Sequence, residues 1–455
     1  MLPLLALLLA APTLTTHAER TGFVETGRFD EVQALCAAFP KAFPGKVKCD
    51  AFGVTPLGRP MLALIASADG ALTPQLASKK GRPVLFLQGG IHAGEIDGKD
   101  AGFWLLRDVL EGKVLPGVLA KVTLVFVPVF NVDGHERFGA NQRPNQNGPK
   151  ELGWRVTSQN LNLNRDYAKA EAPEMQALLK LLHRWDPILY ADLHVTDGAK
   201  FQHDVSVTFE PSNLGPEGLR SQGKSLQVSL FSELEAKGHL PVNFYPSFNT
   251  DDDPASGFAY GWPPPRFGNA YWAANNRYGL LVETHSWKDY RTRVATTYDV
   301  CLGLLRLTAE DGPRWLKAAK QADTSEAKRA GGEVVLLWEP KKTSRPLEFK
   351  GYAYTRDKSD VSGQPWVRYD DTRPEVWTVP YFDELVPALT VKAPAAGWVV
   401  PVQHAAWVAE KLTLHDLDFT ALKADRPGLA VEAYRLVDPK FRTAPYEGRM
   451  IVTAR

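Results

Sequence analysis

RPVLFLQGGIHAGE, residues 82–95, is the stretch that decides the fold of this chain. Residues 82–88 form a mostly apolar run with the length and composition of a buried strand. Gly89 and Gly90 follow, and glycine permits the sharp bend that ends such a strand because it has no side chain. The bend leads into a turn that carries a histidine and, further along, a glutamate. A buried strand therefore brings two chemically active side chains to one end of a sheet.

The sequence beyond this stretch alternates between helical and strand-like patterns. Residues 97–110 have the apolar spacing of a helix, and residues 122–130 form another apolar run. A helix that Pro173 opens ends at Asp186, and residues 188–193 then have the pattern of a strand. Strands that alternate with helices at this spacing need crossover connections, so we expect a largely parallel sheet covered by helices.

Composition divides the chain into four parts. Its 455 residues are too many for one ordinary domain. Residues 1–18 have an apolar run that ends in small residues, which predicts a signal peptide and an exported protein, periplasmic or secreted; a buried N-terminal helix is the alternative. The charged stretch 323–332 has the composition of a linker. We expect it to join an α/β domain over residues 19–322 to a smaller, β-rich domain over residues 333–455.

Charge and cysteine content exclude several classes of partner and site. The net charge is +1 without a cationic block, which disfavours nucleic acid and anionic membranes as partners. No segment after the first is long and apolar enough for stable membrane insertion. Cys36 and Cys49 can pair in an oxidising compartment, and Cys301 has the pattern of a buried thiol. Any metal must therefore be held by histidine and carboxylate.

Metal-binding and acidic side chains stand at the ends of three predicted strands. His92 and Glu95 follow one strand, His194 ends a second, and Glu283 ends a third that covers residues 278–282. Ligands of an open α/β sheet lie beyond the carboxyl ends of its strands. Two imidazoles and one carboxylate are the three protein ligands of a catalytic zinc that keeps its fourth position open. We therefore expect a zinc site, with Zn²⁺ as the cofactor.

Other residues compete for places in this site. His203 and His285 are rival third ligands, but neither lies at the terminus of a strand. Asp192 lies two residues before His194, so on a strand it faces the same side and can orient the imidazole from behind.

Five motifs in this order resemble those of the zinc carboxypeptidases of the M14 family. They are HAGE (92–95), NVDG (131–134), NLNR (162–165), DLH (192–194) and VETH (282–285). The resemblance covers roughly residues 80–300. It implies an α/β/α fold with a mixed, mostly parallel eight-stranded sheet. It also implies zinc-dependent removal of C-terminal residues from peptides.

The resemblance assigns roles to further residues. Asn164 and Arg165, here called the carboxylate clamp, would hold the terminal carboxylate of the substrate, for which the planar fork of arginine is suited. Glu283 would be the general base. Arg155 would stabilise the oxyanion, with Arg143 as the competing choice. The partner implied is a peptide with a free C-terminal carboxylate.

The family also has a mobile tyrosine some twenty residues before the base. Tyr260 fits this spacing best, and Tyr271 is the alternative. Side-chain specificity is not readable from the span that follows, although Arg266 within it favours acidic residues.

Two other functions remain open. A zinc deacylase or amidohydrolase acting on N-acyl amino acids or cell-wall peptides can use the same three ligands. A non-catalytic cell-wall or sugar-binding protein is the second alternative, because the tail is rich in tryptophan. These tryptophans are Trp338, Trp366, Trp377, Trp398 and Trp407.

Overall fold

The computed structural model describes residues 14–435, 437–447 and 449–453. Most of the predicted signal peptide, residues 1–18, lies outside these ranges, so it stays a prediction. The first described element is α1 (His17–Arg20), a single turn whose N-cap is Thr16. Within the described ranges, no helix has both the length and the apolar character needed to cross a membrane.

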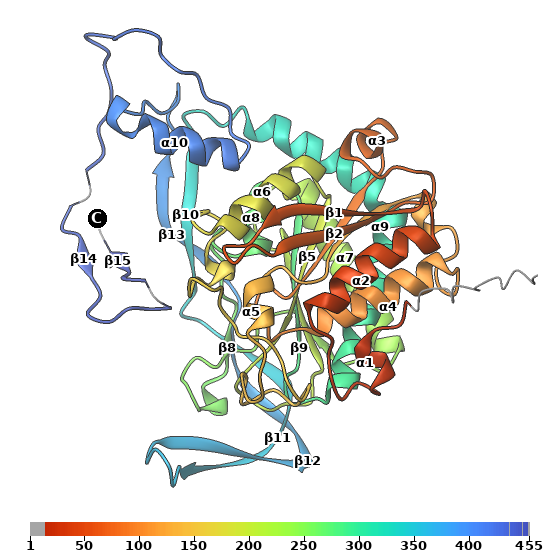
Figure 1. Ribbon diagram of the computed structural model, residues 1–455. Coiled ribbons are helices and arrows are strands. Elements are labelled where there is room, and N and C mark those ends of the chain that lie inside the picture. Colours follow the sequence, from red (N-terminus) through yellow and green to blue (C-terminus); the bar gives the residue numbers. More distant parts are fainter. Residues whose placement is uncertain (1–13, 436, 448, 454–455) are drawn as a thin grey trace, which may run out of the picture.

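A mixed eight-stranded sheet forms the centre of the molecule (Figure 1), which confirms the predicted fold class. Its order is β1-β2-β4-β3-β5-β9-β6-β7. The four central strands β4, β3, β5 and β9 are parallel. Antiparallel pairs join β1 to β2, β2 to β4 and β6 to β9. The strands are β1 (Val47–Val54), β2 (Pro60–Ala66), β3 (Val84–Gly89), β4 (Thr123–Val127), β5 (Leu189–Val195), β6 (Val205–Glu210), β7 (Pro241–Val242) and β9 (Tyr278–Thr284).

Helices cover both faces of this sheet. The helices of the α/β part are α2 (Phe29–Ala42), α3 (Pro74–Lys79), α4 (Asp97–Leu110), α5 (Val132–Glu136), α6 (Pro173–Trp185), α7 (Glu217–Ala236), α8 (Gly268–Ala274) and α9 (Tyr290–Glu326). Short 3-10 turns lie at η1 (Val118–Ala120), η2 (Leu163–Arg165) and η3 (Pro254–Ser256). The apolar spacing that predicted a helix over residues 97–110 thus corresponds to α4.

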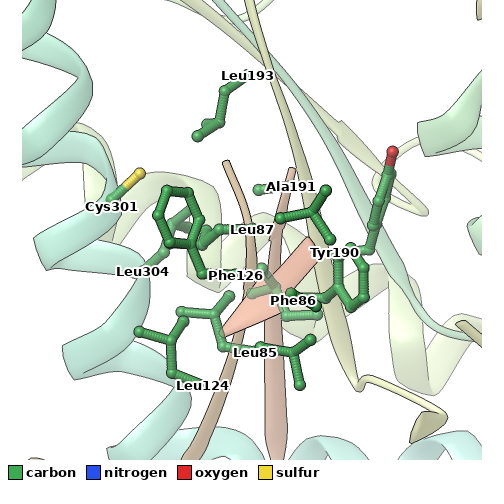
Figure 2. Packing of buried hydrophobic residues seen from close by; sticks show 14 of the residues in the cluster. Leu85, Phe86, Leu87, Leu124, Phe126, Tyr190, Ala191, Leu193, Cys301 and Leu304 are labelled. Carbon is green, nitrogen blue, oxygen red and sulfur yellow. The ribbon is translucent and has the colours of Figure 1, made fainter. Parts of the chain in front are cut away.

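Successive side chains of the central strands alternate between the two helical layers. Leu85 and Leu87 lie on the face of Phe126, beside Cys301 and Leu304 of α9 (Figure 2). Phe86 points to the other face, where it contacts Tyr190. Every residue of β3 and β5 is buried, because a parallel strand is covered on both sides. This explains the nearly continuous apolar run at residues 84–87.

The cysteines behave as their positions predicted. Cys36 of α2 and Cys49 of β1 form a disulfide bond. Cys301 is a buried free thiol.

The C-terminal part continues the molecule with strands that share a core with the α/β part. It contains β10 (Glu333–Pro340), β11 (Arg345–Lys358), β12 (Pro365–Phe382), β13 (Leu385–Lys392), α10 (Val402–Leu414), β14 (Lys440–Phe441) and β15 (Val452–Thr453). The β11–β12 hairpin projects beyond the sheet (Figure 1), and β12 pairs in parallel with β8 (Phe258–Ala259).

A second apolar cluster holds this hairpin in place. It contains Phe244 and Phe258 from the α/β part, and Phe349 and Trp377 from the hairpin. Trp398 and Trp407 are instead exposed. Helix α9 runs to Glu326, four residues into the predicted linker. The proposed domain limits themselves stay a prediction.

An ion-paired histidine fastens α9 to one edge of the sheet. His239 follows α7, and its Nδ1 lies 2.7 Å from Asp204 Oδ2 while its Nε2 lies 3.0 Å from Asp299 Oδ2. Asp204 precedes β6, and Asp299 belongs to α9, where it also pairs with Lys237. The hydrogen bonds to the two carboxylates raise the pKa of His239 to about 9.

This cluster makes the stability of the fold depend on pH. The pKa of His239 is raised above its usual value of 6.5, so its contribution is full below pH 6.5 and is lost as the pH rises through about 9. We expect the difference in unfolding free energy between the wild type and His239→Gln to shrink by about 1–2 kcal/mol over this window, since solvent screens part of the interaction. Urea unfolding between pH 6 and 10 measures it. The exposed-site variant His404→Gln is the control, and a difference that stays constant with pH would contradict the expectation.

Candidate active site

Three residues with metal-ligand atoms meet at the carboxyl ends of β3 and β5. His92 and Glu95 lie in the turn between β3 and α4, and His194 is the sixth residue of β5. Each is only 3% exposed. One ligand atom from each residue lies within 4.8 Å of those of the other two. The structure therefore brings together the three ligands expected from sequence.

Glycines make the turn that carries two of these residues possible. Gly90 has a φ of +65°, a conformation that residues with a side chain rarely adopt. A Cβ on Gly94 would lie 2.7 Å from the carbonyl oxygen of Gly153, so any larger residue would push the turn away from its neighbour.

The two histidines present the same ring nitrogen to the glutamate. His92 Nδ1 lies 3.0 Å from Glu95 Oε1, and His194 Nδ1 lies 2.8 Å from Glu95 Oε2. On the far side of each ring, Nε2 of His92 lies 3.1 Å from Asn162 Oδ1, and Nε2 of His194 lies 3.0 Å from Asp192 Oδ2. Oxygen acceptors there favour a proton on Nε2, which leaves the Nδ1 lone pair free for a metal.

The charge around the cluster fits a bound cation. Arg155 Nη1 donates to both His92 Nδ1 and Glu95 Oε1, each at 3.2 Å. The lone pairs of these two ligand atoms therefore already point at one positively charged group, the guanidinium of Arg155. Burial lowers the pKa of His92 to about 4, which keeps it neutral as a metal ligand must be. Burial opposes a charge on His194 too, but Asp192 and Glu283 raise its pKa well above the usual range. Two imidazoles and a carboxylate of this kind fit zinc.

Glu283 faces this cluster from the next strand. The parallel register of β5 and β9 pairs His194 with Glu283. The Glu283 side chain is buried, and its Oε2 has no hydrogen-bond partner among the described residues. Burial raises its pKa to about 8, although the charge of His194 acts in the opposite direction. A buried carboxylate with a free oxygen is thus available beside the ligands.

Both candidate arginines reach the ligand carboxylate. Arg143 Nη1 donates to Glu95 Oε1 at 2.6 Å, and its Nη2 donates to the carbonyls of Val195 and Thr196. Its side chain is 9% exposed, whereas that of Arg155 is 33% exposed. The structure brings both to the site.

The carboxylate clamp lies beside the cluster, in the turn η2. Asn164 is buried, and the amide of Gly268 points at its Oδ1 at 3.5 Å. The Arg165 guanidinium lies 4.6 Å from the centre of the Phe267 ring, and its Nε is 2.7 Å from Oε2 of Glu447.

The remaining sequence candidates do not join the cluster. Tyr260 donates its hydroxyl to Glu210 and packs in the second apolar cluster. The hydroxyl of Tyr271 lies 2.8 Å from His183 Nε2. His285 stacks on Phe201, and His203 is 3.1 Å from the carbonyl oxygen of Leu240.

Sequence reasoning missed three residues that the structure places here. Asn162, which contacts His92, lies in the quoted NLNR motif, so its spacing from Asn164 was an available signal. Burial of its hydroxyl and the charges of Glu283, Asp197 and Glu95 raise the pKa of Tyr245 well above its usual range, although the residue as a whole is 39% exposed. No local sequence pattern identifies Tyr245 or Glu447, because the relation of each to the site depends on contacts between residues far apart in the sequence.

A fully buried ion pair connects the turn that follows Glu95, the end of β9 and the loop that carries Arg143. Arg293, in the first turn of α9, donates through Nε to Asp97 Oδ2 at 2.9 Å. The same oxygen accepts a hydrogen bond from Thr284, the neighbour of Glu283, at 2.7 Å. Arg293 also donates to four backbone carbonyls. These belong to Asn147, Gly148, Ser286 and Lys288.

Comparison with known proteins agrees with this geometry. Residues 32–215 match the family model described as zinc carboxypeptidase, Peptidase_M14. The match includes the three ligands and the carboxylate clamp, and it ends before Glu283. A search of curated proteins finds no match.

Several solved structures have a similar chain path. A metallo-carboxypeptidase from Burkholderia cenocepacia is 16% identical, with a TM-score of 0.43, over 60% of this chain and 68% of that one. Carboxypeptidase A from Helicoverpa armigera is 15% identical, with a TM-score of 0.43, over 66% and 74%. Bovine thrombin-activatable fibrinolysis inhibitor is 13% identical, with a TM-score of 0.46, over 63% and 99%.

The class of protein follows from the family model together with the site. Fold and site define a metal-dependent hydrolase of the α/β type. Residues 32–215, somewhat less than half of the chain, match the zinc carboxypeptidase family, peptidase M14, and this match together with the site points to a peptide hydrolase.

The buried ion pair behind the site predicts a large loss of stability when it is broken. Asp97→Asn leaves the Arg293 charge buried without a counter-charge, so we expect the free energy of unfolding to fall by about 3–5 kcal/mol. Urea unfolding measures the change. The exposed pair of Arg329 and Glu326 is the control, and Glu326→Gln is expected to stay within about 0.5 kcal/mol of the wild type. A loss below about 1 kcal/mol in Asp97→Asn would show that the pair does not hold the site.

Proposed function

We propose that this protein is a zinc carboxypeptidase that removes C-terminal residues from peptides, with the metal held by His92, Glu95 and His194. The observation that carries the proposal is the convergence of three buried ligand atoms within 4.8 Å. When bound there, zinc would polarise the scissile carbonyl and make water more acidic.

Glu283 is proposed as the general base. Its free Oε2 can take a proton from the attacking water, and the resulting acid can pass that proton to the leaving amine. The register that pairs Glu283 with His194 supports this role, because it places the carboxylate beside a ligand.

Arg155 is the proposed stabiliser of the oxyanion. Its guanidinium is partly exposed and contacts the ligand set directly, so a substrate carbonyl can reach it. Arg143 remains the alternative, but one of its nitrogens is engaged by two backbone carbonyls.

Asn164 and Arg165 are proposed to bind the terminal carboxylate of the substrate. The position of the Glu447 carboxylate at Arg165 supports this role, because it is already a site for a carboxylate. Such binding would make the enzyme selective for free C-termini.

A tyrosine near the base is proposed to contact the substrate. Tyr260 was expected from its spacing, but its hydroxyl is engaged with Glu210. Tyr245 is the better candidate, since the charges of Glu283, Asp197 and Glu95 all act on its hydroxyl and, with burial, raise its pKa.

The proposed compartment is periplasmic or extracellular. The disulfide bond between Cys36 and Cys49 supports it, since such bonds persist mainly in oxidising surroundings. Cell-wall peptides are then among the proposed substrates.

A matched pair of variants tests the general base. Glu283→Gln keeps the shape of the side chain but cannot take a proton, so we expect kcat to fall by about 10²–10⁴-fold with the zinc content unchanged. Glu210→Gln is the control, because Glu210 is a buried carboxylate beside the opposite end of β9, where it pairs with Gly279. Peptide hydrolysis and metal analysis are measured together. Near-normal turnover in Glu283→Gln would show that the base is another residue.

A further inference from the structure

Arg165 of the carboxylate clamp already pairs with a carboxylate that belongs to the protein itself. Glu447, near the C-terminus, places Oε2 at 2.7 Å from Arg165 Nε and Oε1 at 3.7 Å from Arg155 Nη2. Asn162 Nδ2 donates to the same Oε1 at 3.0 Å. Two arginines and an amide thus surround a side chain that comes from about 285 residues further along the chain than Asn162.

A single intervening side chain connects the Glu447 carboxylate to the proposed metal ligands. Asn162 contacts Glu447 through Nδ2 and His92 through Oδ1. Arg155 contacts Glu447 through Nη2, and contacts Glu95 through Nη1. A substrate carboxylate bound by Arg165 would therefore lie where Glu447 now lies.

The charge nearby favours an acidic occupant. The Arg266 guanidinium lies 4.9 Å from the centre of the Phe267 ring, the same ring that Arg165 covers. No carboxylate of the described residues forms an ion pair with Arg266. Its pKa is lowered by burial and by the charge of Arg165, while Glu447 acts in the opposite direction. One glutamate thus offsets a cluster of arginines.

A second contact holds the segment that carries Glu447. Arg449 pairs with Glu171, which follows the clamp in sequence. An isolated β-bridge joins Tyr446 to Arg449 and so closes the turn around Glu447. The segment is therefore attached at two points, at Arg165 and at Glu171.

Little apolar surface keeps this segment in place. Residues 416–435 and 437–447 are all exposed, and Figure 1 shows them as a mainly extended chain beside the α/β part. The Glu447 side chain itself is 26% exposed. Its charged contacts therefore supply most of the attachment, and a competing carboxylate can replace them.

We propose that the segment around Glu447 is an internal competitor, which occupies the carboxylate clamp until the terminal carboxylate of a substrate displaces it. The inference rests on the proposed function only in that the clamp is taken as the substrate site. One clamp cannot bind two carboxylates, so docking of Glu447 raises the apparent KM by the reciprocal of the undocked fraction. It leaves kcat unchanged, because the segment is displaced before chemistry.

The test compares Glu447→Gln with Asp425→Asn, which removes the same charge from an exposed position of the same tail. Steady-state kinetics on a peptide give KM and kcat. Calorimetry with 3-phenylpropanoate, an acid without an amide bond to hydrolyse, measures carboxylate binding without turnover, and the corresponding alcohol, 3-phenylpropanol, is the probe that lacks the carboxylate. We expect Glu447→Gln to lower KM and to tighten binding of the acid about fivefold. The alcohol and Asp425→Asn are expected to show no change.

A second variant keeps the inference falsifiable. Arg449→Ala removes the other attachment without touching the clamp, so it should change KM in the same direction. Unchanged or weaker binding of the acid in both variants would overturn the inference. If binding of the acid tightens but no variant hydrolyses any peptide, the internal competitor is supported and the proposed function is wrong. If both variants hydrolyse peptides with unchanged KM and bind the acid as the wild type does, the proposed function is supported and the internal competitor is wrong.

Discussion

The buried ion pair between Asp97 and Arg293 is the interaction on which the geometry of the site depends. Asp97 lies two residues after the proposed ligand Glu95, and it accepts hydrogen bonds from Arg293 and from Thr284, the neighbour of Glu283. Arg293 in turn holds the carbonyls of the loop that carries Arg143. Burial raises the pKa of Asp97 because it destabilises the negative charge of the carboxylate. The ion pair with Arg293 and the hydrogen bond from Thr284 act in the opposite direction and offset this cost. A single buried contact thus fixes the turn, the strand end and the loop relative to one another.

Much of the fold and of the ligand set follows from local sequence. The apolar runs at β3, β5 and β9 predicted parallel strands, and parallel strands present their carboxyl ends at one edge. His92, Glu95 and His194 meet there, as the order of the motifs indicated. Strand ends differed by up to three residues, because the last residues of a strand are decided by pairing and not by composition. The β11–β12 hairpin was recognised only as short strands, since its pairing with β8 joins residues far apart in sequence.

The parts that sequence did not reveal are long-range contacts made by isolated residues. Tyr245 lies in a loop with no motif, yet burial and the charges of Glu283 and Glu95 raise its pKa, whereas Tyr260, which fits the expected spacing, donates its hydroxyl to Glu210. Glu447 lies in an exposed tail with no pattern of its own, yet it is beside Arg165. The competition between Arg143 and Arg155 is also a matter of geometry, because both contact Glu95 and differ mainly in exposure.

The most direct test of the account is a digest of paired peptides that are identical except for a free or an amidated C-terminus, read by mass spectrometry with zinc-loaded protein. We expect ladders that lose single C-terminal residues from the free acids, with little or no loss from the amides, because an amidated C-terminus offers no carboxylate to the clamp. Internal cuts, release of acyl groups only, or equal cleavage of acids and amides would contradict it.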